Sequence, residues 1–112
     1  MQVPTEAMLL RMFMGEDDQA DGRPLYEAIV IKAREMHLAG ATVLRGPMGF
    51  GRSSRLHTAK ILRLSEDLPV VVEIVDGEAQ IRSFLEAIAP MMGGSLVTLE
   101  KVQVLRYGHE AI

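Results

Sequence analysis

The stretch of sequence that decides the fold is LPVVVEIVDG at residues 68–77, followed by EAQIRSFLEAIA at residues 78–89. Its first part is a run of β-branched residues, which is typical of a central strand, and Gly77 ends the run. Its second part has the i, i+3, i+4, i+7 spacing of an amphipathic helix, at Ile81, Phe84, Leu85 and Ile88. We therefore predict a strand over 70–75 that leads directly into a helix packed on a sheet.

The first half of the chain repeats this plan. Residues 6–14 alternate in the manner of a strand with both faces largely covered. Pro24 can open a helix at its first turn, and Gly40 is a natural stop for that helix. Residues 41–45 are rich in β-formers and predict the next strand.

The end of the chain and the segment before residue 68 are less regular. Residues 96–107 predict a long final strand, and the slip in alternation near Glu100 and Lys101 indicates a bulge. Residues 56–64 fit neither period cleanly, so a strand is assigned there and a short helical turn stays open as the alternative.

The order strand, helix, strand, strand, helix, strand defines the fold class. We predict one α+β domain over residues 1–112, a ferredoxin-like βαββαβ sandwich with a four-stranded antiparallel sheet and two helices on one face. The strands carry more apolar positions than one face needs, and no helix remains to cover the other face. Subunits are therefore expected to meet over that open face.

Composition limits the function classes. The chain has 112 residues, a formal net charge of −3 and no cysteine, so it forms neither disulfides nor thiolate metal sites. A mildly acidic protein is not expected to coat nucleic acid or anionic lipid. We expect a cytoplasmic protein, because no secretory signal and no apolar run of membrane-spanning length are present.

One segment opposes the overall charge. Residues 36–65 contain no aspartate or glutamate, yet they hold the basic residues Arg45, Arg52, Arg55, Lys60 and Arg63. The centre of this segment, GPMGFGRSSR at residues 46–55, combines glycines, hydroxyls and arginines. Glycines allow close backbone approach, and guanidinium groups match phosphate or carboxylate oxygens. The segment predicts an anion-binding loop; a flexible hairpin crossing, with Arg45, Lys60 and Arg63 as solvated positions, is the plainer alternative.

Other residue types give weak signals for chemistry. The histidines, His37, His57 and His109, have no metal-ligand spacing, and the acidic residues at 16–21 are better interpreted as a solvated turn than as a calcium loop. Ser53 or Ser54 with His57 lacks an orienting third group, and alternation places Glu73 and Asp76 on opposite faces. We predict no catalytic residue and no metal site, and we expect a protein that is not an enzyme.

The chain resembles the nitrogen-regulatory PII proteins. The matching segments are residues 40–43, 49–52, 57–58, 68–75 and 104–106. The resemblance is closer to small PII-like domains of unknown function from bacteria and archaea, through residues 24–29, 40–46, 53–54, 57–65 and 70–75. It implies a ferredoxin-like homotrimer that binds adenine nucleotides in clefts between subunits, near the base of a loop called the T-loop. The loop then reports occupancy to a membrane transporter or a metabolic enzyme.

The resemblance also implies the site residues. Those expected to contact the nucleotide or another anion are Gly49, Phe50, Gly51, Arg52, Ser53, Gly93, Gly94 and Arg106, and those expected to face the partner protein are Arg55, His57 and Lys60. Gly93 and Gly94 occupy the place of a phosphate-cradling turn, and Arg106 that of a phosphate-binding arginine.

This chain departs from the PII pattern. The turn at Gly93 lacks a lysine, no lysine follows Pro69, Gly108 replaces a second arginine, and Ser53 replaces a glutamine. Each lost charge-assisted contact costs about 1.5–3 kcal/mol, so triphosphate binding should be weaker. A monophosphate, a cyclic nucleotide or another small anion is as consistent with the sequence as ATP. A metal-responsive trimer of the copper-tolerance type and a small phosphohydrolase stay open as alternatives.

Overall fold

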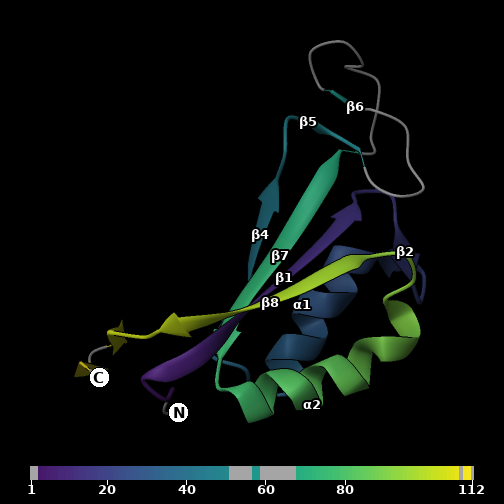
Figure 1. Ribbon diagram of the computed structural model, residues 1–112. Coiled ribbons are helices and arrows are strands. Elements are labelled where there is room, and N and C mark those ends of the chain that lie inside the picture. Colours follow the sequence, from purple (N-terminus) through teal and green to yellow (C-terminus); the bar gives the residue numbers. More distant parts are fainter. Residues whose placement is uncertain (1–2, 51–56, 59–67, 109, 112) are drawn as a thin grey trace.

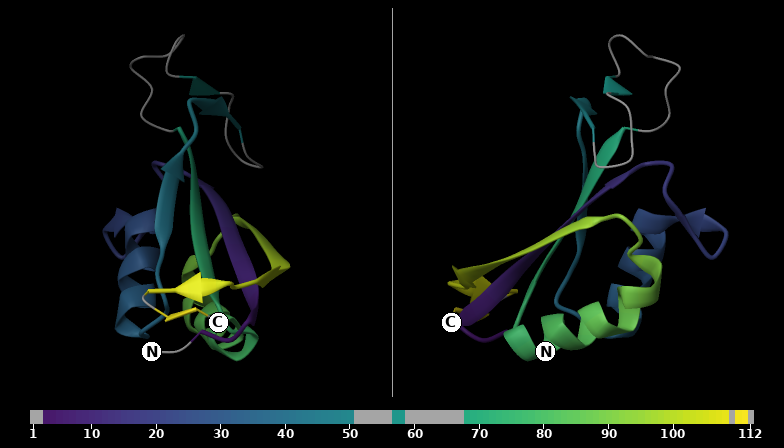
Figure 2. Two further views of the ribbon diagram at one scale, coloured as in Figure 1. Left: turned by 90° about the vertical axis from the view of Figure 1, so that its left-hand side faces the viewer. Right: turned by 45° about the vertical axis from the view of Figure 1, so that its right-hand side comes forward.

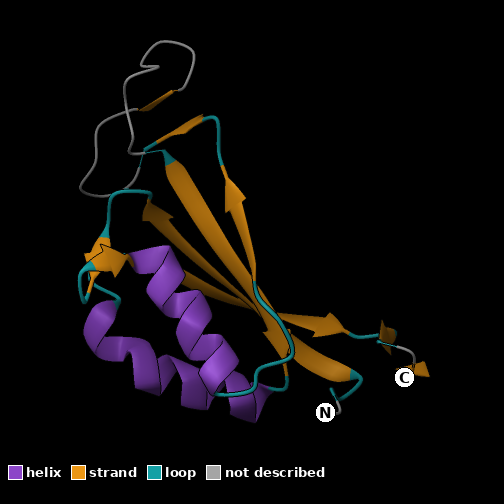
Figure 3. Ribbon diagram, turned by 180° about the vertical axis from the view of Figure 1, so that it is seen from behind, coloured by secondary structure: helices purple, strands orange, loops and turns teal. Residues whose placement is uncertain are grey.

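The computed structural model describes residues 3–50, 57–58, 68–108 and 110–111 (Figure 1). Its main elements follow the predicted order, and they are β1 (Glu6–Gly15), α1 (Leu25–Glu35), β4 (Thr42–Arg45), β7 (Pro69–Asp76), α2 (Glu78–Ile88) and β8 (Leu96–Gln103). The strands form one antiparallel sheet in the order β4-β7-β1-β8. Both helices lie on the same face of this sheet (Figure 3). The predicted ferredoxin-like α+β sandwich is confirmed.

The remaining described elements are short. They are β2 (Gln19–Ala20), β3 (Arg23–Pro24), β5 (Met48–Gly49), β6 (His57–Thr58), the 3₁₀ turn η1 (Ala89–Met91), β9 (Arg106–Tyr107) and β10 (Glu110–Ala111). They pair as three small ribbons, β2 with β3, β5 with β6, and β9 with β10. The strand assigned to 56–64 falls mainly on residues outside the described ranges; within it, only His57–Thr58 is described.

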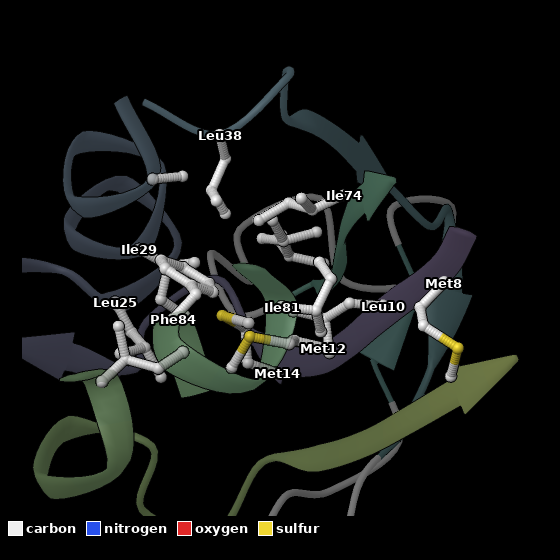
Figure 4. Packing of buried hydrophobic residues seen from close by; sticks show 14 residues of the cluster. Met8, Leu10, Met12, Met14, Leu25, Ile29, Leu38, Ile74, Ile81 and Phe84 are labelled. Carbon is white, nitrogen blue, oxygen red and sulfur yellow. The ribbon is translucent and has the colours of Figure 1, made fainter. Parts of the chain in front are cut away.

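The core lies between the sheet and the two helices (Figure 4). On β7 the buried residues alternate strictly, with Val70, Val72 and Ile74 facing the helices. The other core side chains come from β1 and the helices, and they include Met8, Leu10, Met12, Met14, Leu25, Ile29, Ile81, Phe84 and Ile88. Each such side chain contributes about 1.5–3 kcal/mol of hydrophobic stabilisation, so these contacts hold the helices on the sheet.

The predicted end of the first helix was wrong. Helix α1 ends at Glu35, and His37 takes the left-handed conformation expected of Gly40, with a φ of 61°. The amide of Leu38 donates to Ala33 O over 3.0 Å, and the amide of His37 donates to Arg34 O over 3.1 Å. These two bonds form a Schellman motif, and the buried Leu38 stabilises it. The burial of Leu38 thus outweighs the preference for glycine at the left-handed position that ends the helix.

The final strand also differs from its prediction. Its pairing with β1 is continuous from Leu96 to Gln103, so the predicted bulge near Glu100 is absent. Glu100 interrupts the apolar pattern because it lies on the open face beside Arg11. The strand stops at Gln103, and Arg106–Tyr107 forms the separate strand β9, which lies outside the four-stranded sheet.

Candidate functional site

The sheet face opposite the helices carries no helix in the described part of the chain, as the left view of Figure 2 shows. Register places four apolar residues in one row across it, namely Leu44, Val71, Phe13 and Leu96. Leu96 is 60% exposed, Leu44 48% and Phe13 37%. We call these four residues the apolar row. Exposed apolar side chains that lie next to one another across a sheet are typical of a surface that another protein covers.

A charged cluster lies at the centre of the same face. Arg11 Nε is 2.9 Å from Glu73 Oε2, and Arg11 Nη1 is 3.4 Å from Glu100 Oε1. The hydrogen bond to Glu73 is the main cause that raises the pKa of Arg11, so its guanidinium stays charged. Glu73 therefore has Arg11 as a structural partner on the open face.

The loop that follows β4 starts from a closely packed base, residues 46–50. The amide of Gly46 donates to Pro69 O over 2.8 Å. A Cβ atom at Gly46 would lie 2.9 Å from Pro69 Cγ, and one at Gly49 would lie 3.0 Å from it. Glycine is required there because the rigid proline ring leaves no space for a side chain. Phe50 is 74% exposed at the end of this loop base.

Arg45 connects the loop base to two other elements. Its Nε is 2.7 Å from Glu16 Oε2, its Nη2 donates to the Tyr26 hydroxyl over 3.0 Å, and its Cζ lies 5.5 Å from the Tyr26 ring centroid. The hydrogen bond to Glu16 is the main cause that raises the pKa of Arg45. Arg45 is thus more than a solvated strand position: it joins β4 to the start of α1 and to the turn after β1.

The turn before β8 is the second candidate anion-binding element. Gly93 has a φ of 56°, a left-handed conformation that favours glycine, and the amide of Ser95 closes the turn onto Met92 O over 3.1 Å. Both Gly93 and Gly94 are exposed, and a Cβ atom at either would have no neighbour within 4 Å. The turn is therefore open to a ligand from outside.

Arg106 is the third candidate element. It lies on β9, it is exposed, and it forms no ion pair with any residue in the described ranges. The neighbouring Tyr107 hydroxyl donates to Ala39 O over 2.7 Å. Arg106 is thus an available cation on an anchored segment.

These three elements do not meet within one chain (Figure 1). The loop base and the Gly93 turn lie at the same end of the sheet, because Arg45 pairs with Val70 and Leu96 pairs with Phe13. They are on opposite edges, three strand spacings or about 14 Å apart. Arg106 follows β8 at the other end of the sheet, about 25 Å from the Gly93 turn, because the eight-residue strand β8 separates them. Within a single chain, the candidate anion-binding elements therefore lie far apart.

Several predicted residues lie outside the described ranges. They are Gly51, Arg52, Ser53, Arg55 and Lys60, while His57 is described only through its backbone pairing with Gly49 in β5 and β6. Their expected roles stay predictions. Within the described residues, no three His, Cys, Asp or Glu side chains lie close enough together to hold a metal ion.

Sequence reasoning missed the role of Asp76. The side chain is only 3% exposed, and it accepts hydrogen bonds from the amides of Ala39, at 2.9 Å, and Gly77, at 2.7 Å. It lies on the helix side of the sheet and Glu73 on the open side, so the predicted opposite placement is confirmed. An acidic residue just before Gly77 at the start of a helix was the signal that could have indicated this structural role.

The order of the strands and helices in this fold is that of PII-like proteins. The structure is similar to that of CPII, a nitrogen regulatory PII-like protein from Thiomonas intermedia K12 bound to ADP, AMP and bicarbonate, with a TM-score of 0.68, 14% identity and 90% of each chain covered. It is also similar to a putative PII-like signalling protein from Thermus thermophilus, with a TM-score of 0.64, 12% identity, and 89% of this chain and 90% of that chain covered.

The chain belongs to the DUF190 family (Uncharacterized ACR), whose model matches residues 7–104. A UPF0166 protein of Aquifex aeolicus is 43% identical over 97 residues, covering 87% of this chain and 91% of the relative. A UPF0166 protein of Methanocaldococcus jannaschii is 34% identical over 80 residues, covering 71% of this chain and 73% of the relative. The resemblance to PII-like domains is confirmed. No helix in the described part of the chain is long and apolar enough to cross a lipid bilayer.

Proposed function

We propose that this protein is a PII-like regulator that binds a small anionic effector, an adenine nucleotide, between the subunits of a homotrimer. Binding would change how the protein acts on a membrane transporter or a metabolic enzyme. The observation that carries the proposal is the separation of the loop base, the Gly93 turn and Arg106 within one chain, combined with an uncovered sheet face. Each feature is explained if neighbouring chains complete the site.

The positions of these elements favour a ring of copies over a two-fold dimer. A two-fold contact joins identical patches, whereas a cyclic arrangement brings different edges of neighbouring chains together. Here the loop base lies at the β4 edge and the Gly93 turn at the β8 edge. Three copies form the smallest such ring, with the apolar row of each chain turned toward the others. PII proteins, which the sequence resembles, assemble in this way.

The cations available favour a nucleotide with few phosphates. The Gly93 turn carries no lysine, and Gly108 stands two residues after Arg106. Fewer charge-assisted contacts reduce the gain from each added phosphate. CPII, which shares the fold, has been observed with ADP and AMP, and this supports the same ligand class here. We include in the proposal that the protein has no catalytic activity, since Glu73 and Asp76 both have structural partners.

Isothermal titration calorimetry with AMP, ADP, ATP, cyclic AMP and 2-oxoglutarate, with and without magnesium, tests the proposal. Arg106→Ala and Arg52→Ala should each weaken nucleotide binding at least tenfold, because a charge-assisted contact is worth about 1.5–3 kcal/mol. Arg34→Ala is the matched control, since Arg34 is an exposed arginine on α1 and should bind like the parent protein.

Three results would contradict the proposed site or the proposed function. Unchanged affinity in both site variants would remove those arginines from the site. Binding of copper or zinc without any nucleotide binding below millimolar concentration would favour the metal-responsive alternative. Steady turnover of a nucleotide near one per second would favour the phosphohydrolase.

A further inference from the structure

The segment after β8 crosses the end of the open sheet face. We call residues 104–108 the C-terminal strap. At its start the amide of Val104 donates to Thr5 O over 2.7 Å, and at its far end Tyr107 reaches Ala39, which precedes β4. The strap therefore passes from one edge of the sheet to the other, as the yellow segment in the left view of Figure 2 shows.

The Tyr107 hydroxyl holds the far end of the strap. It donates to Ala39 O over 2.7 Å. The ribbon that follows consists of β9 and β10, which pair two residues each, and a hairpin of that size is not stable on its own. Among the described residues, this exposed bond is the side-chain hydrogen bond that joins the strap to the opposite sheet edge. Its loss should release the strap.

The residue that receives this hydrogen bond is itself fixed. The amide of Ala39 donates to Asp76 Oδ2 over 2.9 Å, so the Ala39 residue is bound through its amide and through its carbonyl. Asp76 is buried, and its other oxygen accepts the amide of Gly77 at the start of α2. Tyr107 is therefore tied to the rigid part of the fold and not to a free loop.

Arg106 is the immediate neighbour of Tyr107 on β9. Side chains alternate along a strand, so Arg106 is directed away from the face on which Tyr107 is tied. Arg106 is exposed, and none of the described residues forms an ion pair with it. Because the backbone of Arg106 is fixed before a ligand binds, less conformational entropy is lost on binding. The arrangement holds a cation ready for an anion.

We propose that Tyr107 is a positioning residue, whose hydroxyl fixes the C-terminal strap so that Arg106 meets the phosphate group of the effector. This proposal rests on the proposed function, and it adds a residue that makes no contact with the ligand. Arg106 is the group that touches the phosphate, and Tyr107 acts only through it.

A double-mutant cycle measured by calorimetry with ADP tests this proposal. Tyr107→Phe keeps the ring and removes only the hydroxyl, and it should weaken ADP binding about three- to tenfold, the equivalent of one hydrogen bond. In the Arg106→Ala background, Tyr107→Phe should cause no further loss. A general loss of structure would instead lower affinity in both backgrounds, and that result would overturn the proposal. Parent-like affinity of Tyr107→Phe would overturn it as well.

Amide hydrogen exchange without ligand separates this inference from the proposed function. Tyr107→Phe should speed exchange at the amides of residues 106–108 and leave β7 unchanged. If the parent protein binds no nucleotide, the proposed function fails, and the positioning role fails with it. If the parent protein binds ADP but amide exchange is unchanged in the Tyr107→Phe variant, the positioning role alone is overturned.

Discussion

Asp76 is the residue on which two distant parts of the chain depend. Its carboxylate accepts the amides of Ala39 and Gly77, so it joins the loop before β4 to the start of α2. The bond from Gly77 is buried and the bond from Ala39 is partly buried, so water has little access to the carboxylate. A single buried side chain thus sets the position of the residue that Tyr107 also contacts.

Replacing Asp76 by alanine should lower the free energy of unfolding by about 2–3 kcal/mol, because one buried and one partly buried amide lose their acceptor. Urea unfolding at one fixed protein concentration measures this change. Asp76→Asn is the matched control, since its remaining oxygen can still accept one amide, and its loss should be clearly smaller. Equal losses in the two variants would show that the cost comes from charge or packing and not from the unpaired amides.

Residue-scale features were the hardest to predict from the sequence. The loop-base glycines were found because their pattern is local, and the structure explains them through contact with Pro69. The links from Arg45 to Glu16 and Tyr26 were not found, because they join positions that lie far apart in the chain. Sequence periodicity carries no information about such pairs.

At the scale of single elements, the end of α1 is the clearest case in which tertiary packing decides where an element stops. His37 occupies a left-handed position that glycine usually fills, and the buried Leu38 keeps it there. The sequence favoured Gly40 because glycine is the usual C-terminal signal. Packing of the following residue decided the boundary instead.

His37→Gly should raise the free energy of unfolding by about 0.5–1 kcal/mol, because glycine adopts the left-handed conformation without steric cost. Thermal unfolding followed by circular dichroism measures the shift. His37→Ala keeps a Cβ atom, and it should be no more stable than the parent. A less stable His37→Gly variant would mean that the imidazole makes a stabilising contact that outweighs its backbone strain.

The elements with strong periodicity were predicted well, and those at the end of the chain were not. The strand over 70–75 and the helix over 78–89 became β7 and α2 with small changes of boundary. The final strand was predicted too long, since Arg106–Tyr107 leaves the sheet while keeping β-type residues. Local propensity is the same inside and outside a sheet, so it cannot show where pairing ends.

At the scale of the whole molecule, the two faces of the sheet differ in what covers them. One face packs on both helices, and the other presents the apolar row and the Arg11 cluster. The sequence anticipated the open face from a surplus of apolar positions. It could not place the loop base, the Gly93 turn and Arg106 at separate corners, because that requires the sheet order.

Leu96→Glu should convert the proposed trimer into monomers, because a carboxylate in the apolar row would be buried without a partner on assembly. Size-exclusion chromatography with light scattering measures the mass. Leu96 is already exposed in the single chain, so the fold itself should persist. Ile31→Glu, on the exposed side of α1, is the control and should leave the assembly intact. A Leu96→Glu protein with parent mass would remove the open face from the subunit contact.

The central place of β1 in the sheet has a consequence for biosynthesis. This strand is made first, yet Arg11 finds its partners Glu73 and Glu100 at sequence separations of 62 and 89 residues. At a synthesis rate of about 5–20 residues per second, β1 waits roughly 5–20 s for β8 to emerge. Both of its edges are unpaired until β7 is made, and the edge that pairs with β8 stays unpaired until the last strand is complete. The nascent chain is therefore expected to need a chaperone or the ribosome surface until the last strand is complete.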